Sequence, residues 1–583
     1  MSSRSKSRLA ALARNHCVPL LIYLSVAVAY TWPLVRDFST KIIGAVPSDP
    51  RHSIWLIWHF KEWLLGHDPL AHTQLLYYPT GVSTLVDGVG PLSAVFALPF
   101  WHWGPVAAYN GAILLGFWLT GYCMYVSAVG LGCSRVPAVF AGLVYQLMPM
   151  HIAGIDAHLE KSFMGLMPLV VLATIRALTP GRHWIWIPGA ALLLLASLLY
   201  TATQFAICIT TIPLIALALL RAAASRRAVA KRLLVLAATS AILIAWPLGA
   251  IARISTDSGI NVNLKDHSSF AEPDVVQFLT PSPYSAVLGG LLYPGERDEL
   301  SRFVSRVDWL QPSLSWYGSG LDTCVTIYIA VAILCIIAVI RRPDPAWAWI
   351  AFAGVFAVLS LGPTLRIFGS VWLVTTKPFV LPYGVLTTRI PGFGFMRAPA
   401  RFMMIGWVGL SIAAAMGVQY LQERYARASR LILVGAVALL LLESWPKPWS
   451  QQQPPPISGF HAQIATDTQP YAILDLPFEW PSASLGSIYQ FDQMTHHKPI
   501  AWGYVSRMYR EYPVKSVVDF MNAGKTPAER LAALGADGYR YVVWHKFPVD
   551  TGAQEQTVKS TFSDRAPIFE DDSITVYETR PPY

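Results

Sequence analysis

The sequence is poor in charged residues, and this shortage excludes most soluble folds. Only 13% of its 583 residues are Asp, Glu, Lys or Arg, whereas 54% are apolar. An ordinary soluble domain contains about 25% charged residues. A chain with so few charges must build most of its core against lipid, which indicates a polytopic α-helical membrane protein.

Paired cysteines are also missing. No CxxC motif occurs, and the six cysteines fall in or at the ends of apolar segments: Cys17, Cys123, Cys133, Cys208, Cys324 and Cys335. This arrangement predicts neither a disulfide framework nor a structural zinc site.

The net charge of +10 does not indicate a nucleic-acid partner, because the basic residues form short clusters between apolar runs. Such clusters follow the positive-inside rule of membrane proteins. Four basic residues precede the first apolar run, residues 18–35, and no small-x-small cleavage site follows it. We therefore expect an uncleaved first transmembrane helix.

Apolar runs of about 16 to 22 residues predict about eleven spans. We place them near residues 18–35, 106–129, 136–150, 163–178, 184–200, 205–220, 233–251, 324–340, 346–361, 402–421 and 431–446. With the N-terminus in the cytoplasm, every short basic cluster then lies inside, provided that residues 90–103 are re-entrant or interfacial. The outer side receives residues 36–105, 151–162, 252–323 and 362–401 and the tail.

The tail has the composition of a separate domain outside the membrane. A Gln- and Pro-rich linker, residues 447–456, divides the transmembrane domain 1–446 from residues 457–583. Strand-like runs at 471–476, 539–544 and 573–577 and a helical run at 527–534 predict a small α/β fold.

The loop after the first span places Asp49 before an aromatic-rich helix that contains Trp55, Trp58 and Trp63 at helical spacing. We expect this helix to lie in the membrane interface. Asp49 is either a helix cap or a catalytic carboxylate at the membrane surface.

Three more groups of polar residues fall on the same outer side. The first loop adds Asp87, whose alternative role is turn formation, and a turn with Tyr78. A short loop carries His158, Glu160 and Lys161, a set suited to phosphate or metal binding and to proton transfer. The segment before the tenth span carries three arginines against the positive-inside bias, which suits phosphate recognition unless they only snorkel: Arg389, Arg397 and Arg401.

The order of these features resembles the GT-C superfamily of membrane glycosyltransferases, and more closely its uncharacterised bacterial members. The resemblance rests on Asp49, the Tyr77-Tyr-Pro-Thr-Gly81 turn, Ala107-Ala-Tyr-Asn110, the Ala157-His-Leu-Glu160 loop and Pro391-Gly-Phe…Arg397-Ala-Pro-Ala-Arg-Phe402. In the tail, Leu474-Asp-Leu-Pro477, Thr495-His-His-Lys-Pro499, Gly503-Tyr-Val-Ser-Arg507 and Val542-Val-Trp-His-Lys546 resemble the extracytoplasmic domain of that group.

The resemblance implies inverting transfer of a sugar from a polyprenyl-phosphate donor to a glycan, lipid or protein acceptor. The reaction would occur on the outer side of the bacterial cytoplasmic (inner) membrane, with the tail outside. Asp49 would act as general base, and Arg397 and Arg401, with His158, would bind the departing lipid phosphate.

The tail residues are assigned to acceptor contact or to closing over the site: His496, His497 and Arg507. The superfamily often carries two acidic residues where this chain has only Asp49. The sequence therefore leaves open whether the protein uses a divalent cation as cofactor. The alternatives are a transporter or flippase of lipid-linked sugars and a non-catalytic glycan-assembly protein. Mid-membrane ionisable groups or an inverted repeat would favour transport, and the sequence shows neither.

Overall fold

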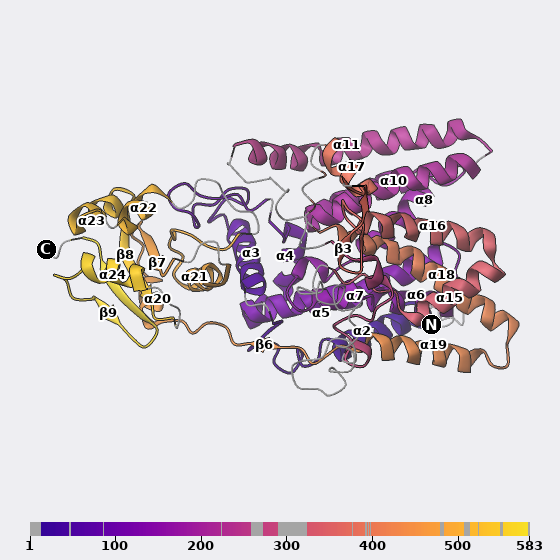
Figure 1. Ribbon diagram of the computed structural model, residues 1–583, viewed down its shortest axis with the longest axis horizontal. Coiled ribbons are helices and arrows are strands. Elements are labelled where there is room, and N and C mark those ends of the chain that lie inside the picture. The colour runs from indigo at the N-terminus through magenta and orange to yellow at the C-terminus, as the bar shows by residue number, and fades with distance from the viewer. Residues whose placement is uncertain are drawn as a thin grey trace, which may run out of the picture.

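A computed structural model of the chain describes most of its length. The described residues are 13–45, 48–85, 87–222, 224–257, 272–289, 323–375, 377–390, 393, 396, 398–478, 483–505, 514–522, 524–547 and 552–580. A helical bundle occupies one end of the long axis and a small sheet domain the other, with α3 and α21 between them (Figure 1).

Every predicted span corresponds to a helix. The bundle contains α2 (Val18–Tyr30), α5 (Pro105–Gly130), α6 (Arg135–Gln146), α8 (Leu166–Leu178), α9 (Trp186–Tyr200), α10 (Ala202–Ala222), α11 (Arg226–Asp257), α15 (Ile329–Arg341), α16 (Pro343–Ser360), α18 (Met403–Arg424) and α19 (Ser429–Ser444). The prediction of a polytopic helical fold is therefore confirmed.

The number of crossings is a separate question. Among the described residues, five helical stretches are long and apolar enough to cross a membrane: 105–130, 202–222, 226–251, 343–360 and 399–424. Four shorter apolar helices accompany them, so the count of eleven stays a prediction. Residues 90–103 form α4 (Pro91–Ala97) and the 3₁₀-helix η2 (Leu98–Trp103), which together are too short for the ~30 Å hydrocarbon core.

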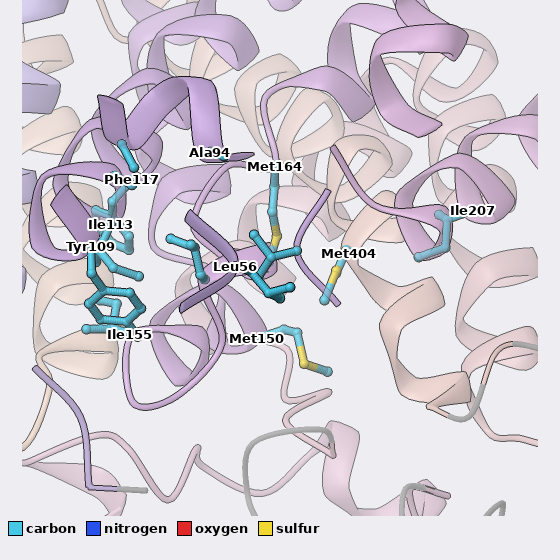
Figure 2. Packing of buried hydrophobic residues seen from close by; sticks show 14 of the residues in the cluster. Leu56, Ala94, Tyr109, Ile113, Phe117, Met150, Ile155, Met164, Ile207 and Met404 are labelled. Atoms are coloured by element: carbon cyan, nitrogen blue, oxygen red, sulfur yellow. The ribbon is translucent and has the colours of Figure 1, made fainter. Parts of the chain in front are cut away.

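The apolar core lies where α3 (Ser48–Leu64), α4, α5 and the short helix α7 (Pro149–Gly154) meet. Figure 2 shows part of it. Tyr109, Ile113 and Phe117 follow one stripe of α5 and are fully buried. Ala94 and Met150 complete the cluster from α4 and α7. This packing fixes α3, whose opposite end carries the candidate site.

The tail forms the predicted α/β domain. Its sheet has the strand order β7-β8-β10-β9, with β7 (Ala472–Leu476) parallel to β8 (Tyr539–His545) and β10 (Ile574–Glu578) antiparallel to β8. The fourth strand is β9 (Phe569–Glu570), and the helices are α20 (Gly459–Ile464), α21 (Ala483–His496), α22 (Lys515–Met521), α23 (Pro527–Ala536) and α24 (Gly552–Thr561). The three predicted strands and the helix at 527–534 are all present.

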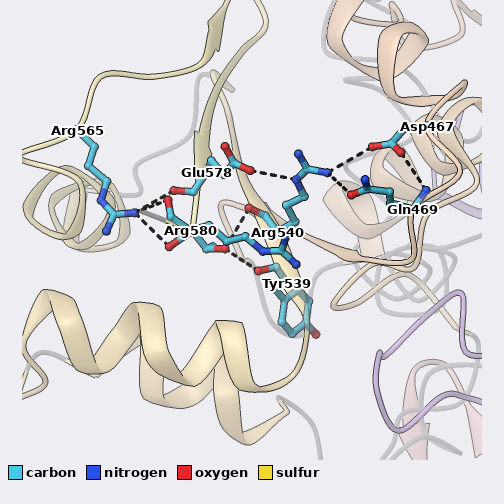
Figure 3. A network of polar contacts seen from close by, with 8 residues as sticks. Asp467, Gln469, Tyr539, Arg540, Arg565, Glu578 and Arg580 are labelled. Atoms are coloured by element: carbon cyan, nitrogen blue, oxygen red, sulfur yellow. Dashed lines mark hydrogen bonds and ion pairs between the residues drawn. The ribbon is translucent and has the colours of Figure 1, made fainter. Parts of the chain in front are cut away.

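Figure 3 shows a network of polar contacts around Arg540 and Arg565 in the tail. Arg540 donates to Glu578 at 3.0 Å and to Gln469 at 3.1 Å, while Arg565 donates to three successive backbone carbonyls of residues 578–580. These contacts tie the last strand to the start of the domain.

The tail docks directly on the first outer loop. Trp55 donates its indole N–H to Gln493 of α21 at 2.8 Å, and Tyr77 donates its hydroxyl to the Gly503 carbonyl at 2.8 Å. Trp55 and Trp58 are buried. The prediction that this aromatic face lies in the membrane interface is therefore wrong for these two residues, because α21 covers it.

Part of the Gln-rich segment ahead of the tail is held by a strand pairing and is not a flexible linker over its whole length. Gln451 and Gln452 form β6, which pairs antiparallel with β1 (Ile42–Ile43) of the first outer loop. The domain boundary at residues 447–456 remains a prediction.

Candidate active site

A cavity of about 540 Å³ opens where α3, the break between α9 and α10, and the loop before α18 meet. One end is polar and the other is apolar. Its lining residues are Asp49, His52, Ser53, Leu56, Leu85, Asp87, Gly88, Val89, His158, Glu160, Leu198, Thr201, Ala202, Thr203, Phe205, Ala206, Ile209, Leu248, Ile251, Ile390, Phe393, Met396, Ala398, Arg401 and Tyr504.

The first turns of α3 provide one wall. Asp49, His52, Ser53 and Leu56 follow the i, i+3, i+4, i+7 pattern of a single helix face, and all four line the cavity. Pro50 in the first turn suits a helix start. Asp49 also lies in the first turn, where the helix dipole favours a negative charge.

The loop after α3 brings a second carboxylate to the cavity. Asp87 Oδ2 lies 2.9 Å from His52 Nε2. Gly90 lets this loop cross close to the end of α9, since a Cβ there would lie 2.3 Å from the Leu199 carbonyl oxygen. The Gly90 N–H donates to the Tyr200 carbonyl at 3.0 Å, which holds the loop in place.

The third polar group comes from the loop around the 3₁₀-helix η3 (Leu159–Lys161). His158 Nδ1 lies 3.6 Å from Asp49 Oδ2 and 3.3 Å from Glu160 Oε1. Tyr200 fixes this loop by donating its hydroxyl to the Leu159 carbonyl at 3.1 Å. The predicted residues Asp49, His158 and Glu160 are thus neighbours, although their loops are distant in sequence.

Arg401 completes the polar end from the short 3₁₀-helix η8 (Pro399–Phe402) that precedes α18. Its Nη2 donates to Glu160 Oε1 at 3.2 Å. Pro399 lies in the first turn of this helix, a position that suits proline. Arg397 lies outside the described residues.

Electrostatics at the polar end favour a charged histidine. Burial lowers the pKa of His52, but the charge and hydrogen bond of Asp87, the charge of Asp49 and the contact with Gln490 outweigh burial and raise the pKa above its usual value. These partners therefore favour the charged form of His52, which lies within one helical turn of Asp49.

Three predicted residues lie away from the cavity lining. Lys161 is buried in η3. Arg389 is exposed at the end of α17 (Pro382–Arg389), beside the lining residue Ile390. Tyr78 lies at the tail junction, where its ring meets that of Tyr539 at 5.9 Å.

The predicted tail residues are placed differently from the expectation. His496 is only 1% exposed inside the tail, so the assignment to acceptor contact is wrong for it, because α21 turns this side chain into the domain. His497 is exposed and its ring meets Trp58 at 5.2 Å. Arg507 lies outside the described residues.

Sequence reasoning missed His52 as a site residue. The helical period could have identified it, because His52 follows Asp49 by three positions and therefore lies on the same face of the helix. Tyr504 belongs to the Gly503–Arg507 segment that the sequence assigns to acceptor contact or to closing over the site, and it does line the cavity. Which residue of that segment reaches the cavity depends on how the tail docks.

The described residues do not form a ready metal site. No group of three His, Cys, Asp or Glu side chains in the described ranges is arranged to hold a metal ion. Glu160 already pairs with Arg401 and His158.

Comparison with solved structures identifies the architecture. The chain superposes on a mycobacterial arabinofuranosyltransferase, AftD, with a TM-score of 0.54 at 14% identity over 97% of this chain. The chain has the GT-C fold. It spans only 40% of the length of AftD, so the superposition carries the GT-C architecture and no more.

Two further structures are similar at lower scores. The oligosaccharyltransferase AglB of Archaeoglobus fulgidus, in complex with an inhibitory peptide and a dolichol-phosphate, gives a TM-score of 0.45 at 11% identity, covering 91% of this chain and 69% of AglB. ArnT of Cupriavidus metallidurans, bound to undecaprenyl phosphate, gives 0.41 at 12% identity, covering 96% and 98%. No family model and no curated protein sequence matches the chain.

Proposed function

We propose that the protein is an inverting glycosyltransferase that uses a polyprenyl-phosphate sugar as donor on the outer side of the bacterial cytoplasmic membrane. The observation that carries the proposal is the two-ended cavity. Its polar end holds carboxylates, histidines and Arg401, while its other end is apolar and formed by α9, α10 and α11. An apolar wall suits a polyprenyl tail, and the polar end suits the phosphate and the sugar.

Asp49 is the carboxylate best suited to act as general base. Asp87 is engaged by His52 at 2.9 Å, and Glu160 is engaged by Arg401 at 3.2 Å. Among the described residues, Asp49 Oδ2 faces His158 Nδ1 at 3.6 Å, and the Asp49 side chain is 24% exposed. A carboxylate with a free oxygen facing a cavity can accept a proton from a bound hydroxyl.

The reaction then proceeds as a single displacement. Asp49 takes the proton of an acceptor hydroxyl, whose oxygen attacks the anomeric carbon. The bond between that carbon and the phosphate oxygen breaks, and the electron pair leaves with the polyprenyl phosphate. Arg401 and His158 stabilise the negative charge that grows on this phosphate, so they act more strongly on the transition state than on the bound donor.

The test compares wild-type protein with Asp49→Asn, using release of polyprenyl phosphate from a labelled donor as readout. Loss of a positioned general base should reduce the rate by about 10²- to 10⁴-fold. Asp68→Asn is the matched control, because Asp68 pairs with His59 outside the cavity lining. If Asp49→Asn stays within a few-fold of wild type, Asp49 is only a helix cap. If the wild-type protein moves intact donor across vesicles and releases no phosphate, the protein is a transporter.

A further inference from the structure

One wall of the cavity comes from the tail. Tyr504 lines the cavity together with Asp49, His52 and Asp87. Its ring meets the imidazole of His52 edge to face, with centroids 4.8 Å apart and planes at 69°. The candidate site is therefore built by both parts of the chain, although no residue of the tail is close to α3 in sequence.

A chain of hydrogen bonds holds this wall in place. Gln490 of α21 donates its side-chain N–H to the Tyr504 carbonyl at 2.8 Å. The other side-chain atom of Gln490, its carbonyl oxygen, faces His52 Nδ1 at 3.3 Å. His52 Nε2 in turn reaches Asp87 at 2.9 Å. Tail, helix and loop are thus joined through one histidine.

These partners also define the charge of His52. The Gln490 side chain donates an N–H to the Tyr504 carbonyl, so its oxygen is the atom that faces His52 Nδ1. A carbonyl oxygen can only accept a hydrogen bond, so His52 Nδ1 must carry a hydrogen. The Asp87 carboxylate accepts as well, so His52 Nε2 must carry one too. An imidazole with hydrogens on both nitrogens is an imidazolium, which agrees with the raised pKa of His52.

We propose that Tyr504 is the contact for a carbohydrate acceptor, and that the Gln490–His52–Asp87 chain positions it beside Asp49. This inference rests on the proposed function and narrows its acceptor from glycan, lipid or protein to a sugar. An aromatic side chain offers a flat apolar surface to the C–H groups of a sugar ring. The two carboxylates beside it, Asp49 and Asp87, accept hydrogen bonds from sugar hydroxyls.

The polar end suits a sugar better than a lipid acceptor. Its lining combines one tyrosine with Asp49, Asp87 and Glu160, while α10 and α11, where the donor tail is proposed to lie, contribute no charged residue to the lining. A lipid acceptor would bring a second hydrocarbon chain, which would have to share the apolar wall with the polyprenyl tail of the donor. A sugar needs only the aromatic surface and the acceptors at the polar end.

The first experiment measures binding without turnover. The full-length protein in detergent is applied to an array of envelope-type oligosaccharides and of peptides rich in Ser and Thr. We expect wild type and Tyr504→Phe to retain at least one oligosaccharide, because both have an aromatic ring, and Tyr504→Ala to lose it by about tenfold or more. Gln469→Ala, in the tail but outside the cavity lining, is the matched control and should bind as wild type does.

Several outcomes overturn the inference. Retention of peptides and no oligosaccharide by the wild-type protein makes the acceptor a protein, and retention of nothing removes the sugar contact altogether. Equal oligosaccharide binding by wild type and Tyr504→Ala makes Tyr504 a docking residue only.

A second measurement separates this inference from the proposed function. Release of polyprenyl phosphate to water by the wild-type protein, with no acceptor present, reports donor cleavage by itself. In Tyr504→Ala, the KM for the retained oligosaccharide in the transfer reaction should rise about tenfold or more, a larger factor than the fall in kcat. Absence of donor cleavage in the wild-type protein refutes the proposed function, whereas an unchanged KM refutes only the role of Tyr504. Equal loss of both activities in Tyr504→Ala shows a structural role.

Discussion

Acidification should weaken the tail through His461, a residue of α20 that is 1% exposed. Neither of its ring nitrogens has a hydrogen-bond partner in the described part of the chain, and Asp492 lies 3.8 Å from Nδ1. Burial, the largest cause, lowers the pKa of His461 from 6.5 to about 4. The folded protein therefore keeps this imidazole neutral at pH values where the unfolded chain protonates it.

The direction and size of the stability change follow from the difference between the pKa of His461 in the folded and in the unfolded chain. Because the folded pKa is depressed, the stabilisation is fully present above pH 6.5 and is lost as the pH falls toward 4. A shift from 6.5 to about 4 corresponds to about 3 kcal/mol in total at 1.36 kcal/mol per unit. About 2 kcal/mol of this is lost between pH 7 and pH 5.

The assay is the unfolding temperature of the full chain in detergent at pH 7 and pH 5. Replacement by leucine removes the titration, so the drop on acidification should be smaller in His461→Leu than in wild type by about 4 to 8 °C. At pH 7 the variant should be at least as stable as wild type, because it removes two unpaired polar atoms. His183→Gln, at an exposed position, serves as control. An equal drop in wild type and His461→Leu would refute the reasoning.

Three further predictions concern the donor phosphate site, a buried carboxyl group of the tail and the orientation of the chain in the membrane. Arg401→Lys keeps the charge but loses the planar fork, and should slow donor cleavage about ten- to hundred-fold, as measured in single turnovers; normal turnover would make Arg401 an interfacial anchor. Burial raises the pKa of Asp492 well above its usual value, so the stability contributed by the protonated carboxyl group is lost as the pH rises. Asp492→Asn should therefore unfold at a higher temperature than wild type at pH 8. A lower unfolding temperature would contradict this. A reporter fused after residue 583 should be active only outside the cytoplasm, and cytoplasmic activity would overturn the orientation.

The bundle could be predicted because lipid imposes a simple length rule on apolar runs. The tail strands were also predictable, since Tyr539 to His545 is rich in aromatic and β-branched residues, which favour a sheet. Where helices begin depended on caps and prolines, as at Pro50 and Pro399, and these signals were local too.

The site was predictable only in part. Asp49, Asp87, His158 and Glu160 could be assigned to one side of the membrane, and charge placed against the topological rule marked Arg401. The sequence could not show how the tail docks, because the Trp55–Gln493 hydrogen bond joins residues 438 positions apart. That contact turned a predicted interfacial helix into a buried one and brought Tyr504 to the cavity.

The docking of α3 against α21 has a consequence for whether the two parts of this chain can be exchanged. Removal of the tail at the Gln- and Pro-rich segment 451–456 would uncover Trp55 and Trp58, which are buried against it. The same deletion would leave the His52 Nδ1–H without the Gln490 oxygen that accepts from it. A tail transplanted from another enzyme would have to reproduce both the aromatic contact and the glutamine, so the tail is not an interchangeable module.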